Sequence, residues 1–223
     1  MSNEHRFGEE EVRGVYRAIY ERRDVRSTFL PDPLPDDLIA RLLDAAHHAP
    51  SVGFMQPSRF IVIKDPAIRA AIYQNFECAN HAAAQQYEGT RALQYRNLKL
   101  AGILEAPVNV CVVSESATLR GSGLGRQTIP ETALYSTVCA VQNLWLAARA
   151  EGVGVGWVSI LNPEHLRATL AIPPSATAIA YLCLGYVSSF ASDPDLERHG
   201  WEERAPLEEV VFTDRFGHIE RKE

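Results

Sequence analysis

Residues 131–150 are the segment that most constrains the fold of this chain. They have the length of a long helix, and apolar side chains occur on nearly all of its sides. A helix of this kind has to be buried on most of its faces, because water would otherwise meet apolar surface all round it. The fold must therefore place other layers around this helix. We also expect part of it to form a large helical interface between two copies of the chain.

Strands and helices alternate along the rest of the chain. Short apolar or β-branched runs predict strands, and apolar residues repeating at three and four positions predict helices. The strands are expected at 60–63, 108–113, 152–160 and 178–187, and the helices at 9–22, 35–49, 67–80 and 163–170. The connections are too irregular for a simple βαβ series, so the predicted fold class is α+β, with a mixed sheet flanked by helices.

The domain organisation follows from the same patterns. We expect one domain over residues 1–223, without internal repeats. The segment at about 81–105 is helix-like but polar and irregular, which suits a lid better than a core element. The tail at about 190–223 has no strong period before residues 207–212 and is predicted to be an extended C-terminal arm, long enough to wrap over a neighbouring subunit.

Charge and composition exclude several classes of function. The 223 residues include 22 basic and 28 acidic side chains, a net charge of −6, whereas binders of nucleic acids and anionic membranes present basic surfaces. No apolar run is long enough to span a bilayer. The polar, acidic start lacks the basic and apolar regions of a signal peptide. We therefore expect a cytoplasmic protein without nucleic-acid or membrane partners.

The four cysteines are far apart in the sequence, and Cys111, Cys139 and Cys183 have apolar neighbours. This pattern is typical of buried, reduced thiols rather than of a disulfide framework. Cys78 and His81 form an isolated pair without a second pair of ligands, so we expect no metal site.

A glycine-rich segment with Gly152, Gly154 and Gly156 suggests a dinucleotide-binding loop at first sight. The spacing excludes it, because the third glycine of G-x-G-x-x-G would fall on Trp157, and the segment lies between a helix and a strand rather than the reverse. Small residues here instead allow a planar group or another backbone to approach the strand. Residues 121–126 lack the Lys-Ser/Thr pair of a P-loop and are interpreted as a flexible loop.

Three arginines, Arg22, Arg23 and Arg26, follow the first helix. Their mutual repulsion costs free energy unless acids or an anion lie among them, and a guanidinium group can bind two phosphate oxygens at once. A solvated charged turn would have the same pattern, and Arg204 is equally ambiguous. Residues 50–57 fit either a ligand-binding loop or a structural turn. Ser159 lacks the Gly-x-Ser-x-Gly context of a hydrolase nucleophile, although its hydroxyl could still bind a cofactor or an intermediate.

Taken together, these motifs resemble the nitroreductase superfamily of FMN enzymes. Ordinary members usually have Ser at the position of Asp24 and commonly Asn at that of Phe54. In both differences, and in having Ser159, this chain resembles a branch of the superfamily that fragments reduced FMN. The resemblance spans nearly the whole chain and rests on Glu21-Arg-Arg-Asp-Val-Arg26, Ala49-Pro-Ser-Val-Gly-Phe-Met-Gln-Pro57, Tyr95-Arg-Asn-Leu-Lys-Leu100, the segment from Tyr135 to Ser159, Cys183-Leu-Gly-Tyr186 and Arg204-Ala-Pro-Leu-Glu-Glu209.

The resemblance implies an α+β fold and a homodimer with two FMN sites at the subunit interface. It implies that reduced FMN is a substrate, with O2 as co-substrate. The implied products are 5,6-dimethylbenzimidazole, the lower ligand of vitamin B12, and erythrose 4-phosphate. A flavin reductase or another supply of reduced flavin would then be a partner, with NAD(P)H as one external reductant.

The site residues follow from the same resemblance. Asp24 is the acid–base candidate, because carbon–carbon cleavage and aromatisation both move protons near the ribityl chain, and Ser159 would orient a ring intermediate. Arg96 and Lys99 would belong to the lid, which keeps water out. The FMN-binding set would be Arg22, Arg23, Asp24, Val25, Arg26, Ser51, Gly53, Gln56, Ser159 and Arg204, and which arginine meets the phosphate stays open.

Two other functions stay open at this point. An NAD(P)H-dependent nitro- or quinone reductase would need an open face above the flavin and no essential acid at position 24. A non-catalytic FMN-binding protein would store or deliver the flavin unchanged.

Overall fold

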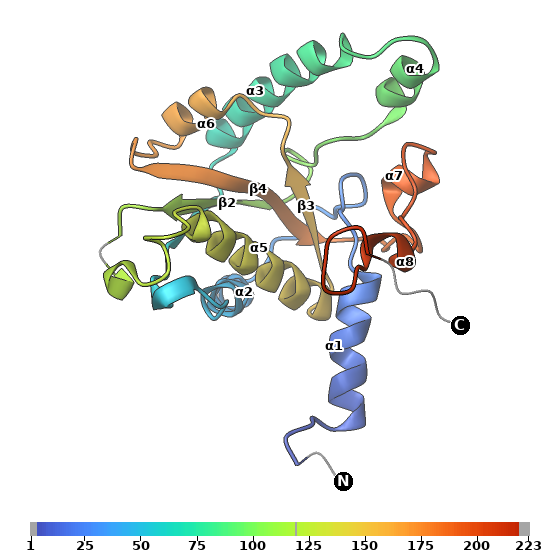
Figure 1. Ribbon diagram of the computed structural model, residues 1–223. Helices are drawn as coiled ribbons and strands as arrows, with labels where there is room; N and C mark the ends of the chain where they lie inside the picture. The colour runs from blue at the N-terminus through green and yellow to red at the C-terminus, as the bar shows by residue number, and fades with distance from the viewer. Residues whose placement is uncertain (1–3, 119, 219–223) are drawn as a thin grey trace.

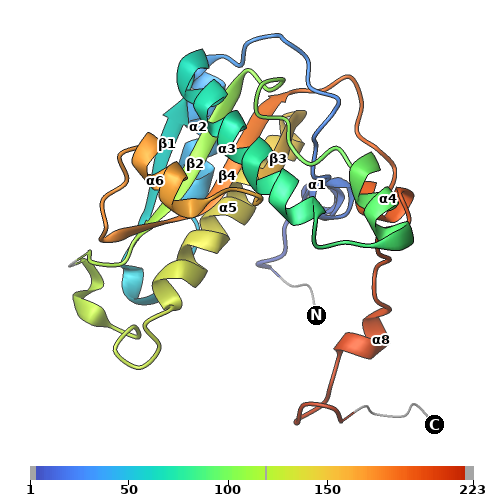
Figure 2. The same cartoon turned by 90° about the horizontal axis from the view of Figure 1, so that it is seen from above.

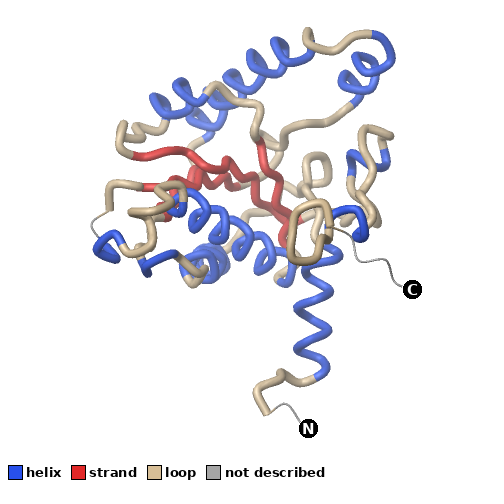
Figure 3. The backbone as a smooth tube through the Cα atoms, viewed as in Figure 1, coloured by secondary structure: helices blue, strands red, loops and turns tan. Residues whose placement is uncertain are grey.

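The computed structural model describes residues 4–118 and 120–218 of the chain. Its four-stranded sheet, in the order β1-β2-β4-β3, lies between two layers of helices (Figures 1 and 3). The main elements are α1 (Glu9–Glu21), α2 (Asp36–His47), β1 (Ser58–Ile63), α3 (Pro66–Ala84), α4 (Gly89–Asn97), β2 (Val108–Glu115), α5 (Thr132–Ala150), β3 (Val153–Val158), α6 (Pro163–Thr169), β4 (Ala176–Tyr186), α7 (Asp195–Arg198) and α8 (Leu207–Val210). The predicted α+β fold is confirmed.

The sheet explains where the two halves of the core lie. All three pairs of named strands are antiparallel, and the parallel component is a single bridge between Asp24 and Val155. Successive side chains of a strand point to opposite faces. Val110 therefore packs with α2 and α5, whereas Cys111 packs with α3 and α6, and both are fully buried.

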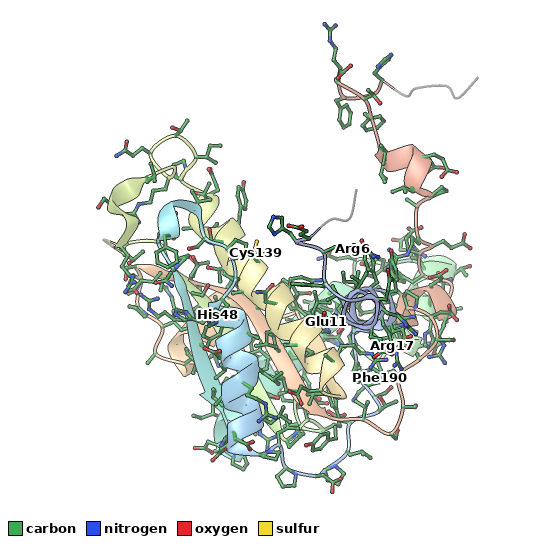
Figure 4. The ribbon with its side chains drawn as sticks, turned by 90° about the horizontal axis from the view of Figure 1, so that it is seen from below. Arg6, Glu11, Arg17, His48, Cys139 and Phe190 are labelled. Carbon is green, nitrogen blue, oxygen red and sulfur yellow. The ribbon has the colours of Figure 1, made fainter. Side chains whose placement is uncertain are left out.

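The long apolar helix is α5, and it is buried on most of its faces, as predicted. One stripe stays open, formed by Tyr135, Val138 and Cys139. The prediction that Cys139 is buried is wrong, because Cys139 lies on this open stripe with Val138 (Figure 4), whereas the next residues, Ala140 and Val141, are buried. Cys111 and Cys183 are buried, as predicted.

The first helix, α1, projects from the body of the molecule (Figure 1). Its amphipathic character is confirmed, although none of its residues is buried. The apolar residues on its last turns, Val15, Tyr16, Ile19 and Tyr20, are all exposed. Figure 4 looks along this helix, with the polar residues Glu11 and Arg17 labelled. The chain therefore leaves an apolar helical face uncovered.

Two segments differ in detail from the sequence prediction. The helix predicted at 67–80 continues to Ala84. The rest of the segment at 81–105 is helical only in α4, which begins after a break at Gly89 with φ +55°. The tail folds back on the body around α7 and then extends away from it at α8 (Figure 2).

Candidate functional site

The site begins where the segment after α1 runs alongside β3. The backbone N–H of Val25 donates to the carbonyl of Val155 at 3.0 Å, and Asp24 forms the parallel bridge to the same residue. This approach requires glycine: a Cβ atom on Gly156 would lie 2.0 Å from the carbonyl oxygen of Val25. One on Gly154 would meet side-chain atoms of Val25 at 3.2 Å. The glycine-rich segment therefore admits another backbone, one of the two options its sequence suggested.

This docking places the carboxyl group of Asp24 over the end of β3. Its Oδ1 accepts a hydrogen bond from the backbone N–H of Trp157 at 2.9 Å, and its Oδ2 is paired with Nη2 of Arg26. Burial raises the pKa of Asp24, and Arg26 and the Trp157 N–H oppose that rise. Asp24 is thus a partly buried acid whose proton affinity is increased by its surroundings, as expected of a group that exchanges protons.

A pocket of about 560 Å³ opens beside Asp24, and we call it the arginine pocket. Four arginines and two aspartates line it, so the formal charge of its wall is positive. The lining residues are Ile19, Tyr20, Arg22, Arg23, Asp24, Arg26, Gln142, Pro194, Asp195, Leu196 and Arg204. Hollows of about 710 and 970 Å³ lie elsewhere, beside β1 and between α3 and α4. We favour the arginine pocket as the site because only its wall, among these three, combines several arginines with a partly buried acid.

The arginines of this pocket are held in different ways. Arg22 lies over the ring of Trp145, 4.7 Å from its centre, and burial lowers its pKa, with Arg23 and Arg204 adding repulsion. Arg23 donates to backbone carbonyls of Tyr20, Arg22 and Ser192. Arg26 is committed to Asp24. Among the four, Arg22 and the exposed Arg204 are therefore freest to meet a ligand.

Two buried guanidinium N–H groups near the site lack a hydrogen-bond acceptor in the described part of the chain. Nε of Arg23 and Nε of Arg26 have no hydrogen-bond partner among the described residues. A buried N–H without an acceptor is costly. An anionic ligand in the pocket would offset part of the repulsion among its arginines.

Ser159 lies just beyond the end of β3 and is exposed. It stands two residues after Trp157, about 7 Å further along an extended chain. Since Trp157 anchors Asp24, the serine and the carboxylate belong to the same end of β3. No described residue accepts a hydrogen bond from its hydroxyl, so that group is free to bind a ligand.

Ser51, Gly53 and Gln56 lie at the other end of α5. The loop is fixed by a hydrogen bond from the Val52 N–H to Oγ of Ser136 at 3.2 Å and by one from the Gln56 N–H to Oγ of Ser51. Ser136 is six residues before Gln142, the α5 residue in the pocket wall, a separation of about 9 Å along a helix. None of Ser51, Gly53 and Gln56 lines the pocket. One copy of the chain therefore does not bring this loop to the arginine pocket.

The two predicted lid residues also lie outside the arginine pocket. Arg96 is exposed beside the hollow between α3 and α4, and Lys99 is paired with Glu105.

Sequence reasoning missed several residues of the pocket. Trp145 supports Arg22 and donates from Nε1 to the carbonyl of Arg23 at 3.2 Å. Gln142 enters the wall from α5, and residues 194–196 enter from the tail. The regular spacing of Gln142 and Trp145 on one helix was the only available signal, and it does not reveal which loop the helix meets.

The described residues also lack two features that other functions would need. No group of three His, Cys, Asp or Glu side chains within residues 4–118 and 120–218 could hold a metal ion. In the same part of the chain, no helix is both long and apolar enough to cross a bilayer.

The chain is similar in sequence to proteins of known name. A protein named 5,6-dimethylbenzimidazole synthase from Rhodospirillum rubrum is 46% identical over 185 residues, covering 83% of this chain and 87% of its own length. A protein of the same name from Rhodobacter capsulatus is 44% identical over 188 residues, covering 84% and 90%.

Solved structures and a family model give a consistent result. The fold matches oxidized iodotyrosine deiodinase bound to FMN and 3-iodo-L-tyrosine with a TM-score of 0.72 at 20% identity, covering 91% of this chain and all of that one. The model of the nitroreductase family matches residues 19–186, which include the docked Asp24 segment, α5 and β3. The chain therefore belongs to the nitroreductase family.

Proposed function

We propose that this chain is a 5,6-dimethylbenzimidazole synthase, which consumes reduced FMN and O2 and releases 5,6-dimethylbenzimidazole and erythrose 4-phosphate. The observation that carries the proposal is the carboxyl group of Asp24, held by Trp157 and Arg26 in the wall of an arginine-lined pocket. Two relatives with more than 40% identity over most of the chain have that name.

The residues of the arginine pocket fit FMN. Its volume of about 560 Å³ is in the range of sites for cofactors. Arg22 and Arg204 would bind the phosphate, because they are the least committed arginines of the wall and repel each other without an anion. A protein of the same fold has been solved with FMN bound.

Asp24 would move protons during the reaction. When bound, reduced FMN would supply the electrons that react with dioxygen and the atoms that become the benzimidazole. Oδ1 and Oδ2 of Asp24 would take a proton from the ribityl chain and return one later, as the raised pKa favours. Arg26 holds the carboxyl group in place, and Ser159 would orient the reacting ring through its hydroxyl.

The site would be completed by a second copy of the chain. Ser51, Gly53 and Gln56 do not reach the arginine pocket of their own chain, so a homodimer that brings this loop from the partner would supply them. Apolar surface is available for such an interface on α1, with Tyr16 and Ile19 exposed, and along the open stripe of α5. The segment at 81–105 would act as the lid, with Arg96 and Lys99, that excludes water.

One assay tests the function against its alternatives. The protein is given chemically reduced FMN and air, without nicotinamide, and dimethylbenzimidazole is measured by chromatography. Product supports the synthase, and a separate flavin reductase would then supply the reduced FMN. Recovery of all FMN intact contradicts the proposal. Turnover that requires NAD(P)H and leaves FMN intact would identify a reductase, and tight binding without turnover would identify a flavin carrier.

A further inference from the structure

Residues of the C-terminal tail form one wall of the arginine pocket, and the structure shows what holds them there. Pro194, Asp195, Leu196 and Arg204 line the pocket, although they follow the last strand and belong to no large element. We call residues 194–204 the strap. The only helix in the strap is α7, with four residues, which is too short to be stable alone. Contacts outside the pocket must therefore hold the strap.

The strap turns sharply at the end of α7. The N–H of Trp201 donates to the carbonyl of Leu196 at 2.8 Å, and the N–H of Gly200 donates to that of Glu197 at 2.9 Å. Gly200 has φ +64°. This is a Schellman motif, in which a left-handed glycine closes the helix. The turn fixes Trp201 relative to Leu196, which lines the pocket.

Trp201 then packs on the side chains of the segment around α4. Its ring lies 5.3 Å from that of Tyr87 and 6.0 Å from that of Tyr95, and the guanidinium of Arg91 lies 4.1 Å from its centre. Tyr87 and Tyr95 stack on each other at 4.8 Å. Aromatic pairs and cation–π contacts of this kind each add stabilisation beyond simple burial.

A hydrogen bond adds a second link between the same two elements. Nε2 of Gln94 on α4 donates to the carbonyl of Gly200 at 3.0 Å. Figures 1 and 2 both show α7 beside α4. The strap is thus held at its turn by α4, while its two ends form part of the pocket wall.

We propose that Trp201 is a positioning residue that couples α4 to the phosphate end of the arginine pocket. By docking on Tyr87 and Tyr95, it holds the strap so that Arg204, three residues further on, faces Arg22 across the pocket. This inference rests on the proposed function only in taking the phosphate of FMN as the anion that Arg204 meets. In this proposal α4 and the strap move as one unit. The segment expected to act as a lid would then also determine the position of Arg204 and, through it, the affinity for the phosphate.

The test measures binding rather than turnover. Oxidised FMN and riboflavin, which lacks the phosphate, are titrated against the native protein and against Trp201→Ala, with flavin fluorescence as the readout. We expect Trp201→Ala to weaken FMN binding about tenfold, the effect of losing one charge-assisted contact, and to leave riboflavin binding unchanged. Trp201→Phe, which keeps an aromatic ring, should restore most of the FMN affinity.

A double-mutant cycle shows whether Trp201 acts through Arg204. If it does, Trp201→Ala should have little further effect on FMN affinity in a protein that already has Arg204→Ala. Phe216→Ala is the matched control, because it removes an exposed ring from the same tail beyond the strap and should leave both affinities unchanged.

Three results would overturn the inference: equal losses for FMN and riboflavin, additive losses in the cycle, or native FMN affinity in Trp201→Ala. Each of them requires that the native protein binds FMN. Failure of the native protein to bind FMN would instead contradict the proposed function, so the two failures are distinguishable.

Discussion

Replacing Gly156 by Ala should displace the segment that contains Asp24 and Val25 without changing any polar side chain of the site. The added Cβ atom would lie 2.0 Å from the carbonyl oxygen of Val25, whereas ordinary contacts begin at 3.4 Å. The segment at Asp24 and Val25 would have to move by about 1.4 Å (3.4 minus 2.0). Such a move would break the hydrogen bonds that Val25 and Asp24 form with β3.

The expected cost can be worked out from the two hydrogen bonds that would break. The bond from Val25 to Val155 is a backbone pair, worth about 1 kcal/mol, and that from Trp157 to the Asp24 carboxylate is charge-assisted, worth about 2 kcal/mol. The free energy of unfolding should therefore fall by about 3 kcal/mol. For a chain of this length the melting temperature should fall by roughly 6–12 °C.

The assay is thermal unfolding followed by circular dichroism, together with dimethylbenzimidazole yield from reduced FMN in air. The yield should fall about a hundredfold, since a 1 Å misplacement of a reacting group has effects of this size. Gly14→Ala is the matched control, because a Cβ atom there meets nothing within 4 Å in the middle of α1, and it should melt no lower than the native protein. A melting temperature within about 2 °C of native for Gly156→Ala, with normal yield, would refute the reasoning.

The remaining predictions concern the polar groups. Asp24→Asn should bind FMN but make at least about a hundredfold less product; normal yield would remove Asp24 from the chemistry. Because burial raises the pKa of Asp24 above 3.8 despite Arg26, the folded state binds this proton more tightly than the unfolded chain. The free energy of unfolding should then fall as pH rises from 3.8 to the raised pKa. In Asp24→Asn, the free energies of unfolding measured by urea titration should change less with pH across that window. Ser159→Ala should keep FMN affinity and lose product in the chromatographic assay, and equal yields would exclude its hydroxyl. Arg22→Ala should weaken FMN binding about tenfold, measured by fluorescence titration, and unchanged affinity would contradict its place at the phosphate.

Local patterns were enough to predict most of the fold. The β-branched run at 108–113 became β2, and the apolar segment at 131–150 became α5, because burial on both faces of a strand or on most faces of a helix leaves a direct trace in composition. The error at Cys139 has the same origin. Neighbours in sequence lie on different faces of a helix, so an apolar neighbourhood does not show that every member is buried.

The glycine-rich segment at Gly152, Gly154 and Gly156 shows what a local sequence pattern can predict and what it cannot. Its sequence indicated that something approaches β3 closely, but not what. The answer, the backbone of Val25, comes from more than 100 residues earlier in the chain, and no local period records a contact over that separation. The same holds for the bond between Asp24 and Trp157, which turns a charged turn after α1 into part of a site.

The arginines at 22, 23 and 26 illustrate why residue type alone could not assign roles. In sequence they are three equal cations, and repulsion among them predicts only that some anion or acid is near. The fold makes them unequal: Arg23 is occupied by backbone carbonyls and Arg26 by Asp24, while Arg22 rests on Trp145. A residue already committed to a structural partner gains less from a ligand than a free one, because it must give up that partner first. Binding of the FMN phosphate should therefore depend more on Arg22 and Arg204 than on Arg23 and Arg26.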